Sequence, residues 1–141
     1  MNVFLVEDDQ SLRTVWEHAL EDAGHTVESA ASQHDAMRTL LTGSFDLIVL
    51  DVVVRNGNGL NLVDYISYAH PQTPVMVVTG TGFFPNGELS ELMPKIDWFM
   101  RKPVPVADFM ASVDHARART ERCSGEALAD PDFVSDQRYV V

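Results

Sequence analysis

The run Leu47-Ile48-Val49-Leu50-Asp51 is the most strand-like stretch of the chain, and the rest of the fold can be worked out from it. Four consecutive apolar residues that end in an acid are too few for a helix core, so they predict a buried strand. Similar short apolar runs occupy residues 3–6, 75–78 and 98–100, and a weakly alternating run covers residues 25–30. We therefore expect five strands.

Segments with apolar residues at helical spacing separate these strands. Gly24 follows the first segment and can supply the left-handed residue that ends a helix. Ser32, with Asp35 three residues later, resembles a capping box at the start of the second. Helices are expected at residues 12–23, 32–43, 60–70, 88–93 and 105–122.

Strands that alternate with helices indicate a parallel sheet covered on both faces. Five such units in about 120 residues match the smaller doubly wound α/β folds. We predict a flavodoxin-like five-stranded parallel sheet, in the order 2-1-3-4-5, with helices on both faces. Residues 1–122 are expected to form this domain, and residues 123–141 a C-terminal tail.

Composition and charge exclude several classes of protein. The chain has 141 residues, which fits one domain, and 45% of them are hydrophobic, which is enough for a core. Lys and Arg number 10 against 21 acids, a formal net charge of -11, which argues against nucleic-acid binding and against an anionic membrane surface. One cysteine rules out an internal disulfide, and no apolar run approaches the roughly 18 residues of a membrane span. We expect a soluble, cytoplasmic protein.

Acidic, hydroxyl and amine groups follow the predicted strands at the points where the strands end. Ligands of such folds bind at the carboxyl ends of the strands, so these groups should converge. Clustered carboxylates need a hard cation, and Mg²⁺ prefers oxygen ligands. A carboxylate can act as a nucleophile, while a metal, an ammonium and a hydroxyl stabilise a phosphoryl group in transfer. The groups are Glu7, Asp8 and Asp9, then Asp51, Thr79 and Lys102.

Five segments, in this order and at these spacings, resemble the receiver domain of two-component response regulators. They are residues 4–9, 47–51, 59–60, 74–80 and 99–103. The resemblance implies that Asp51 is the phosphoacceptor and that Mg²⁺ is bound by Glu7, Asp8, Asp51 and the backbone carbonyl of Val53. It also implies that Thr79 and Lys102 contact the phosphoryl group.

The same resemblance implies a signalling role rather than an enzyme. Phe99 corresponds to the aromatic switch residue of the family, and the Lys102-Pro103 bond to a position that is usually cis. The phosphoryl group would come from a histidine kinase or a histidine phosphotransfer protein. The signal would pass to a downstream protein target, with a homodimer as one possible assembly.

The sequence also departs from the family pattern at three places. Arg55 replaces a proline that usually follows the phosphoacceptor by four residues. Residues 94–97 replace the usual Gly-Ala ahead of the last strand, and glycines and prolines interrupt the fourth helix. None of these departures touches the residues with chemical roles.

Two other functions would use parts of the same residue pattern. Haloacid-dehalogenase phosphatases also use an Asp nucleophile, but they need a second acid two residues later, where this chain has Val53. A receiver domain that only binds proteins, without phosphorylation, is the other alternative, although the acidic, hydroxyl and amine set is complete. The histidines show no metal spacing and are expected at the surface or its boundary; they are His18, His25, His34, His70 and His115.

Overall fold

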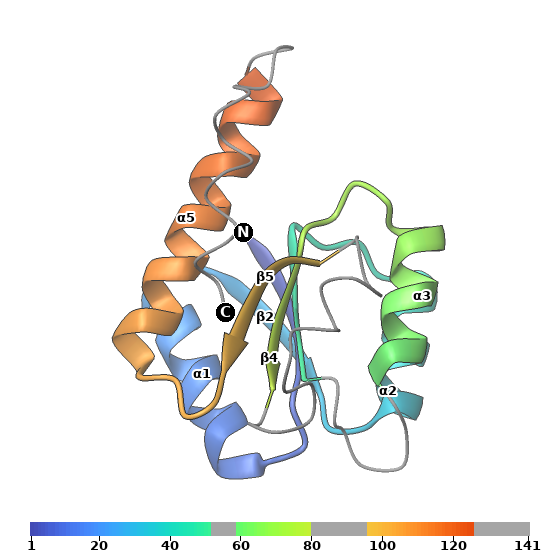
Figure 1. Ribbon diagram of the computed structural model, residues 1–141, viewed down its shortest axis with the longest axis horizontal. Helices are drawn as coiled ribbons and strands as arrows, with labels where there is room; N and C mark the ends of the chain where they lie inside the picture. Colours follow the sequence, from blue (N-terminus) through green and yellow to red (C-terminus); the bar gives the residue numbers. More distant parts are fainter. Residues whose placement is uncertain (52–58, 80–95, 126–141) are drawn as a thin grey trace.

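The computed structural model describes residues 1–51, 59–79 and 96–125 (Figure 1). The strands are β1 (Asn2–Val6), β2 (Thr26–Ala30), β3 (Leu47–Leu50), β4 (Val75–Thr79) and β5 (Ile96–Arg101). The helices are α1 (Gln10–Asp22), α2 (Gln33–Thr42), α3 (Gly59–Ala69) and α5 (Val106–Gly125). From β1 to β4, strands and helices alternate as the sequence predicts.

The five strands form one parallel sheet in the order β2-β1-β3-β4-β5. This confirms the predicted flavodoxin-like fold. The pairing register sets Val6 of β1 beside Leu50 of β3, so both strands reach the same level at their carboxyl ends. The residues that follow them directly, Glu7 and Asp51, therefore begin next to each other.

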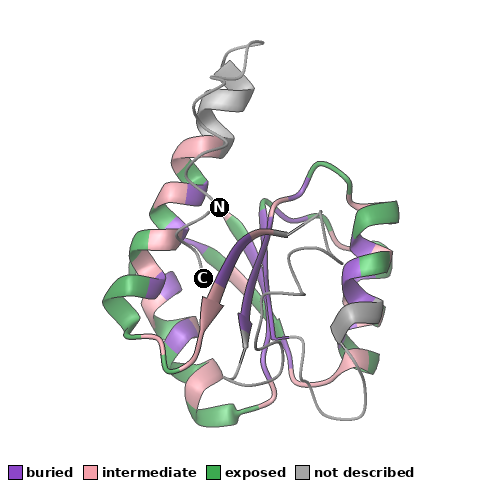
Figure 2. Ribbon diagram, in the orientation of Figure 1, coloured by how far each residue is buried: buried purple, intermediate pink, exposed green. Residues whose placement is uncertain are grey.

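Helices cover both faces of the sheet, with α1 and α5 on one side and α2 and α3 on the other (Figure 1). Trp16 of α1 stacks on Phe109 of α5 with ring centroids 4.5 Å apart. The side chains of β1 from Val3 onward and all those of β3 are buried (Figure 2). Such burial on both faces explains why these strands have continuous apolar runs instead of alternating patterns.

Local signals fix the ends of the first two helices. Asp9 caps α1, with its carboxylate accepting a hydrogen bond from the Leu12 amide. Ser32 caps α2 by accepting from the Asp35 amide, as the sequence predicts. Gly24, at φ 94°, adopts the left-handed backbone that ends α1.

Two details differ from the sequence predictions. Helix α5 runs on to Gly125, past the expected end near Arg122, because no residue at that point stops a helix. His25, expected near the surface, is 6% exposed, because the turn after α1 folds it against the chain terminus, where its Nδ1 lies 3.0 Å from the Met1 nitrogen. The predicted helix at 88–93 and the tail from residue 126 lie outside the described residues. Within the described ranges, no helix is long and apolar enough to cross a membrane.

Candidate functional site

Three carboxylates meet at the carboxyl end of the sheet. Glu7 and Asp8 follow β1, and Asp51 follows β3. One oxygen from each of the three lies within 4.8 Å of the others. Main-chain hydrogen bonds hold the two strand ends, from the Glu7 amide to the Ala30 carbonyl and from the Asp51 amide to the Val6 carbonyl, each at 3.0 Å. The cluster is therefore built on the ends of adjacent strands.

Lys102 brings one positive charge into this cluster from the segment after β5. Its Nζ lies 2.8 Å from Glu7 Oε1 and 2.9 Å from Asp51 Oδ2. The Lys102-Pro103 peptide bond is cis, as the resemblance implies. The lysine side chain thus bridges the acids that follow β1 and β3.

Burial makes this arrangement electrostatically demanding. Glu7 is fully buried and Asp51 is 4% exposed. Burial raises the pKa of Glu7 above 4.5, and the charge of Asp51 raises it further, although a hydrogen bond from Lys102 acts in the opposite direction. Burial alone would lower the pKa of Lys102, but hydrogen bonds to Glu7 and Asp51 outweigh it and raise that pKa. The ammonium therefore remains charged near neutral pH.

The donor set fits a hard divalent cation. Three carboxylates converge, and the Lys102 ammonium forms ion pairs with two of them. Carboxylate oxygens are the ligands that Mg²⁺ prefers, and Asp8 is only partly buried, which leaves room for the waters that Mg²⁺ retains. Glu7, Asp8 and Asp51 could therefore hold Mg²⁺.

Most of the predicted site residues fall at this end of the sheet. Glu7, Asp8, Asp51 and Lys102 lie together, and Thr79 closes β4 at the same edge. The Thr79 side chain and the whole of Val53 lie outside the described part of the structure.

Phe99, the predicted switch residue, is 4% exposed in β5, with the Arg101 guanidinium 5.7 Å from its ring centroid. The Phe99 ring is therefore buried.

Asp9, which the sequence places at this strand end, supports the cluster through its main chain: its amide donates to Glu7 Oε2 at 3.1 Å, while its carboxylate caps α1. Sequence reasoning missed Arg13, whose Nη1 donates to the Glu7 carbonyl at 2.8 Å. A possible signal was the spacing, because Arg13 lies four residues after the helix cap Asp9, on the same face of α1.

Curated proteins with similar sequences are longer regulators. The DNA-binding transcriptional regulator NtrC of Rhizobium meliloti (strain 1021) is 28% identical over 120 residues, 85% of this chain and 25% of NtrC. The transcriptional regulatory protein DltR of Streptococcus agalactiae serotype III (strain NEM316) is 27% identical over 88% of this chain and 54% of DltR. The chain spans a quarter to about half of these relatives.

Solved structures agree with the fold. A CheY-like response regulator receiver domain protein from Methanospirillum hungatei JF-1 has a TM-score of 0.79 at 22% identity, covering 86% of this chain and 96% of that one. The beryllofluoride-activated NtrC4 receiver domain dimer has a TM-score of 0.75 at 28% identity, covering 84% and 98%. The family model of the response regulator receiver domain matches residues 3–114. The chain therefore belongs to the response regulator receiver domain family.

Proposed function

We propose that Asp51 accepts a phosphoryl group from a histidine kinase or a histidine phosphotransfer protein, with Mg²⁺ bound at the same site. The observation that carries the proposal is the contact of Lys102 with both Asp51 and the buried Glu7. It sets a carboxylate nucleophile and a cation for phosphoryl oxygens within one hydrogen bond of each other. Receiver domains are signalling modules, so the product would be a signalling state.

The transfer needs few chemical groups. An Asp51 oxygen attacks phosphorus, the P–N bond of the donor phosphohistidine breaks, and a P–O bond to Asp51 forms. The Lys102 ammonium, 2.9 Å from Asp51 Oδ2, is close enough to stabilise charge on a phosphoryl oxygen. Glu7, Asp8, Asp51 and the Val53 carbonyl would hold Mg²⁺, which supplies a positive charge to the phosphoryl oxygens when bound.

The output would be a protein contact. In the proposed active state, Thr79 moves toward the phosphoryl group and Phe99 changes its packing, which biases two states of the domain. An unchanged Phe99 ring environment with and without a phosphoryl mimic, by aromatic NMR, would contradict this part of the proposal.

Names of relatives suggest two kinds of partner. NtrC is named a DNA-binding regulator, but this chain covers a quarter of its length and has a net charge of -11, so we do not extend DNA binding to these residues. The NtrC4 receiver was solved as a dimer, which supports a homodimer as one assembly of the phosphorylated form.

Phosphate-affinity gels test the proposal directly. With acetyl phosphate and MgCl₂, the wild-type protein should shift, while Asp51→Ala should not. Asp64→Ala, at an exposed acid of α3, is the matched control and should shift like wild type. If the wild type is not modified by acetyl phosphate or by a phosphorylated phosphotransfer protein, the domain is a phosphorylation-independent binding module.

A further inference from the structure

Arg13 connects the first turns of α1 to the acidic cluster. Its Nη1 donates a hydrogen bond to the main-chain carbonyl of Glu7 at 2.8 Å, and the side chain is partly buried. Glu7 is the fully buried acid of the cluster, so its carbonyl has little access to water. The arginine therefore satisfies an acceptor at the point where β1 passes into the turn that carries Asp8.

Further hydrogen bonds close this turn on itself. The Asp9 amide donates to Glu7 Oε2 at 3.1 Å, so Glu7 is held through its side chain as well as its carbonyl. Asp9 in turn accepts from the Leu12 amide through its carboxylate and from the Arg13 amide through its carbonyl. Asp8 makes none of the hydrogen bonds named here, but it lies between Glu7 and Asp9, which make them. The network therefore fixes the main chain on both sides of Asp8.

We propose that Arg13 is a positioning residue for the Mg²⁺ site, acting through the Glu7 carbonyl to fix the direction of the Glu7 and Asp8 carboxylates. This inference rests on the proposed function, because it assumes that the carboxylates bind Mg²⁺. Preorganised ligands bind a cation more tightly, since less ordering remains to be done on binding.

The charge of Arg13 would weaken Mg²⁺ binding, in contrast to its hydrogen bond. A guanidinium near the cluster repels a divalent cation, so removing its charge alone should tighten Mg²⁺ binding. Loss of the hydrogen bond to Glu7 should weaken binding. The two roles of Arg13 therefore predict opposite signs for the same substitution.

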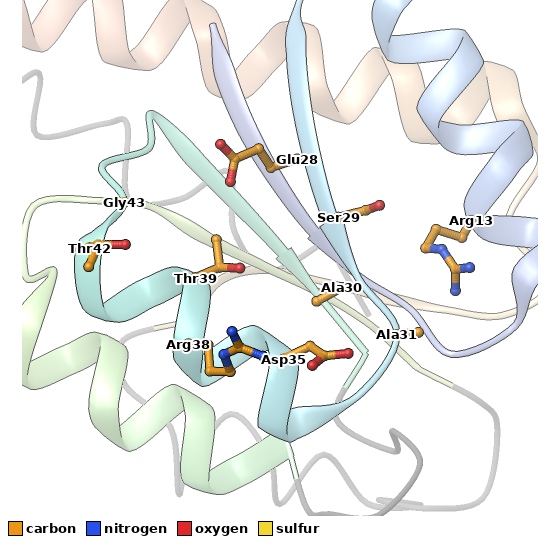
Figure 3. Close-up of a pocket in the computed structure, with 10 residues that line it drawn as sticks. All are labelled: Arg13, Glu28, Ser29, Ala30, Ala31, Asp35, Arg38, Thr39, Thr42 and Gly43. Atoms are coloured by element: carbon orange, nitrogen blue, oxygen red, sulfur yellow. The ribbon is translucent and has the colours of Figure 1, made fainter.

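The chain offers a matched control in Arg38. Arg13 from α1 and Arg38 from α2 line one open groove of about 720 Å³ beside β2 (Figure 3). Arg38 is exposed, whereas Arg13 is the arginine that donates to the Glu7 carbonyl. Arg38→Gln removes the same guanidinium group and charge as Arg13→Gln, but it leaves the hydrogen bond to the turn after β1 in place.

The test is an NMR titration of the full chain with MgCl₂, following the Asp8 and Asp9 amides, together with hydrogen exchange of the Asp9 amide. We expect Arg13→Gln to weaken Mg²⁺ binding about 5-fold and to speed Asp9 exchange, since one net hydrogen bond is lost. Arg13→Lys, whose shorter side chain keeps a donor that can partly replace the hydrogen bond to the Glu7 carbonyl, should fall between Arg13→Gln and wild type. Arg38→Gln should match wild type in both measurements.

Mg²⁺ binding by Arg13→Gln that equals or exceeds the wild-type affinity would overturn the positioning role. Equal weakening by Arg38→Gln would also overturn it, because the weakening would then not depend on the hydrogen bond to the Glu7 carbonyl. If Arg13→Gln does not fold, Arg13→Lys decides. Weaker Mg²⁺ binding and faster hydrogen exchange of the Asp9 amide support the positioning role, and wild-type values for both overturn it. A wild-type protein that binds no Mg²⁺ would refute the proposed function, and this inference with it.

Discussion

The two ends of the parallel sheet both contain buried polar groups, but they balance them differently. At the amino end, Thr73 and the partly buried Asp97 bond to the main chain: Thr73 Oγ1 donates to the Phe45 carbonyl at 3.2 Å, and Asp97 Oδ2 accepts from the Val75 amide at 2.9 Å, while Asp97 Oδ1 lies 3.8 Å from Arg119 Nη2. At the carboxyl end, Glu7 and Asp51 are buried close together and Lys102 forms ion pairs with both.

This difference indicates that the polar groups at the amino end contribute to stability, whereas the acids at the carboxyl end are typical of a functional site. Buried polar groups that are paired with main-chain groups add modestly to stability. Buried like charges cost stability and are typical of sites where a ligand or a reaction needs them. We therefore expect substitution of Lys102 to lower the free energy of unfolding more than substitution of Thr73 does. Substitution of Asp51 should raise the free energy of unfolding, which is the opposite sign.

The largest effect is expected from Lys102→Met. This change leaves Glu7 buried without its cation, and it should lower the free energy of unfolding by about 2–3 kcal/mol, less than a fully buried pair because the lysine side chain is 22% exposed. Thr73→Val, which removes one hydrogen bond at the amino end, should cost about 1 kcal/mol. Urea denaturation in EDTA measures both.

A double variant sharpens this comparison. Lys102→Met with Glu7→Gln should recover much of the lost stability, because the buried charge is then gone as well. Wild-type stability of Lys102→Met would mean that the carboxyl end does not depend on the lysine for charge balance.

Asp51→Asn should have a smaller effect of opposite sign. The charge of Asp51 disfavours ionisation of Glu7, and an asparagine oxygen can still accept from Lys102, so without metal the variant should be more stable by about 1 kcal/mol. In MgCl₂ the gain should shrink or reverse, because the metal stabilises the folded wild type. Asp64→Asn, at an exposed position of α3, should show neither change. A clear loss of stability in EDTA would contradict a strained acidic cluster.

Much of this site could be predicted because parallel topology brings strand ends together. The uninterrupted apolar run of β3 identified a central strand, and the acid after it had to lie at the carboxyl edge. The resemblance then suggested the roles that we propose for Asp51 and Lys102. The order of the strands explains why both could be placed without any knowledge of side-chain directions.

The rest depends on side-chain geometry that residue spacing does not specify. In the sheet, β4 and β3 lie between β5 and β1, so the reach of Lys102 to Glu7 crosses two strands. The bond of Arg13 to a carbonyl follows from the direction of one side chain on α1. The burial of His25 could not be predicted because β2 is an edge strand with a weak pattern, and the contact comes from Met1, outside that pattern.

The smallest expected effect concerns pH and involves His25 at the amino end. Burial lowers its pKa below 6.5, the Met1 ammonium and Arg117 lower it further, and Asp114 raises it slightly. Because the folded protein then binds this proton less readily than the unfolded chain, stability is highest when His25 is neutral and falls as pH drops from about 6.5 toward the lower folded pKa. Glu7 acts in the opposite direction, since its raised pKa lets the folded state take up a proton above 4.5 and gain stability as pH falls.

Urea midpoints between pH 7.5 and 5 should therefore fall less steeply in His25→Gln than in wild type, and more steeply in Glu7→Gln, while His18→Gln, at an exposed histidine, should follow wild type. Parallel curves for wild type and His25→Gln would show that the amino end carries no pH dependence of its own, and the contrast between the two ends would then rest on the acids alone.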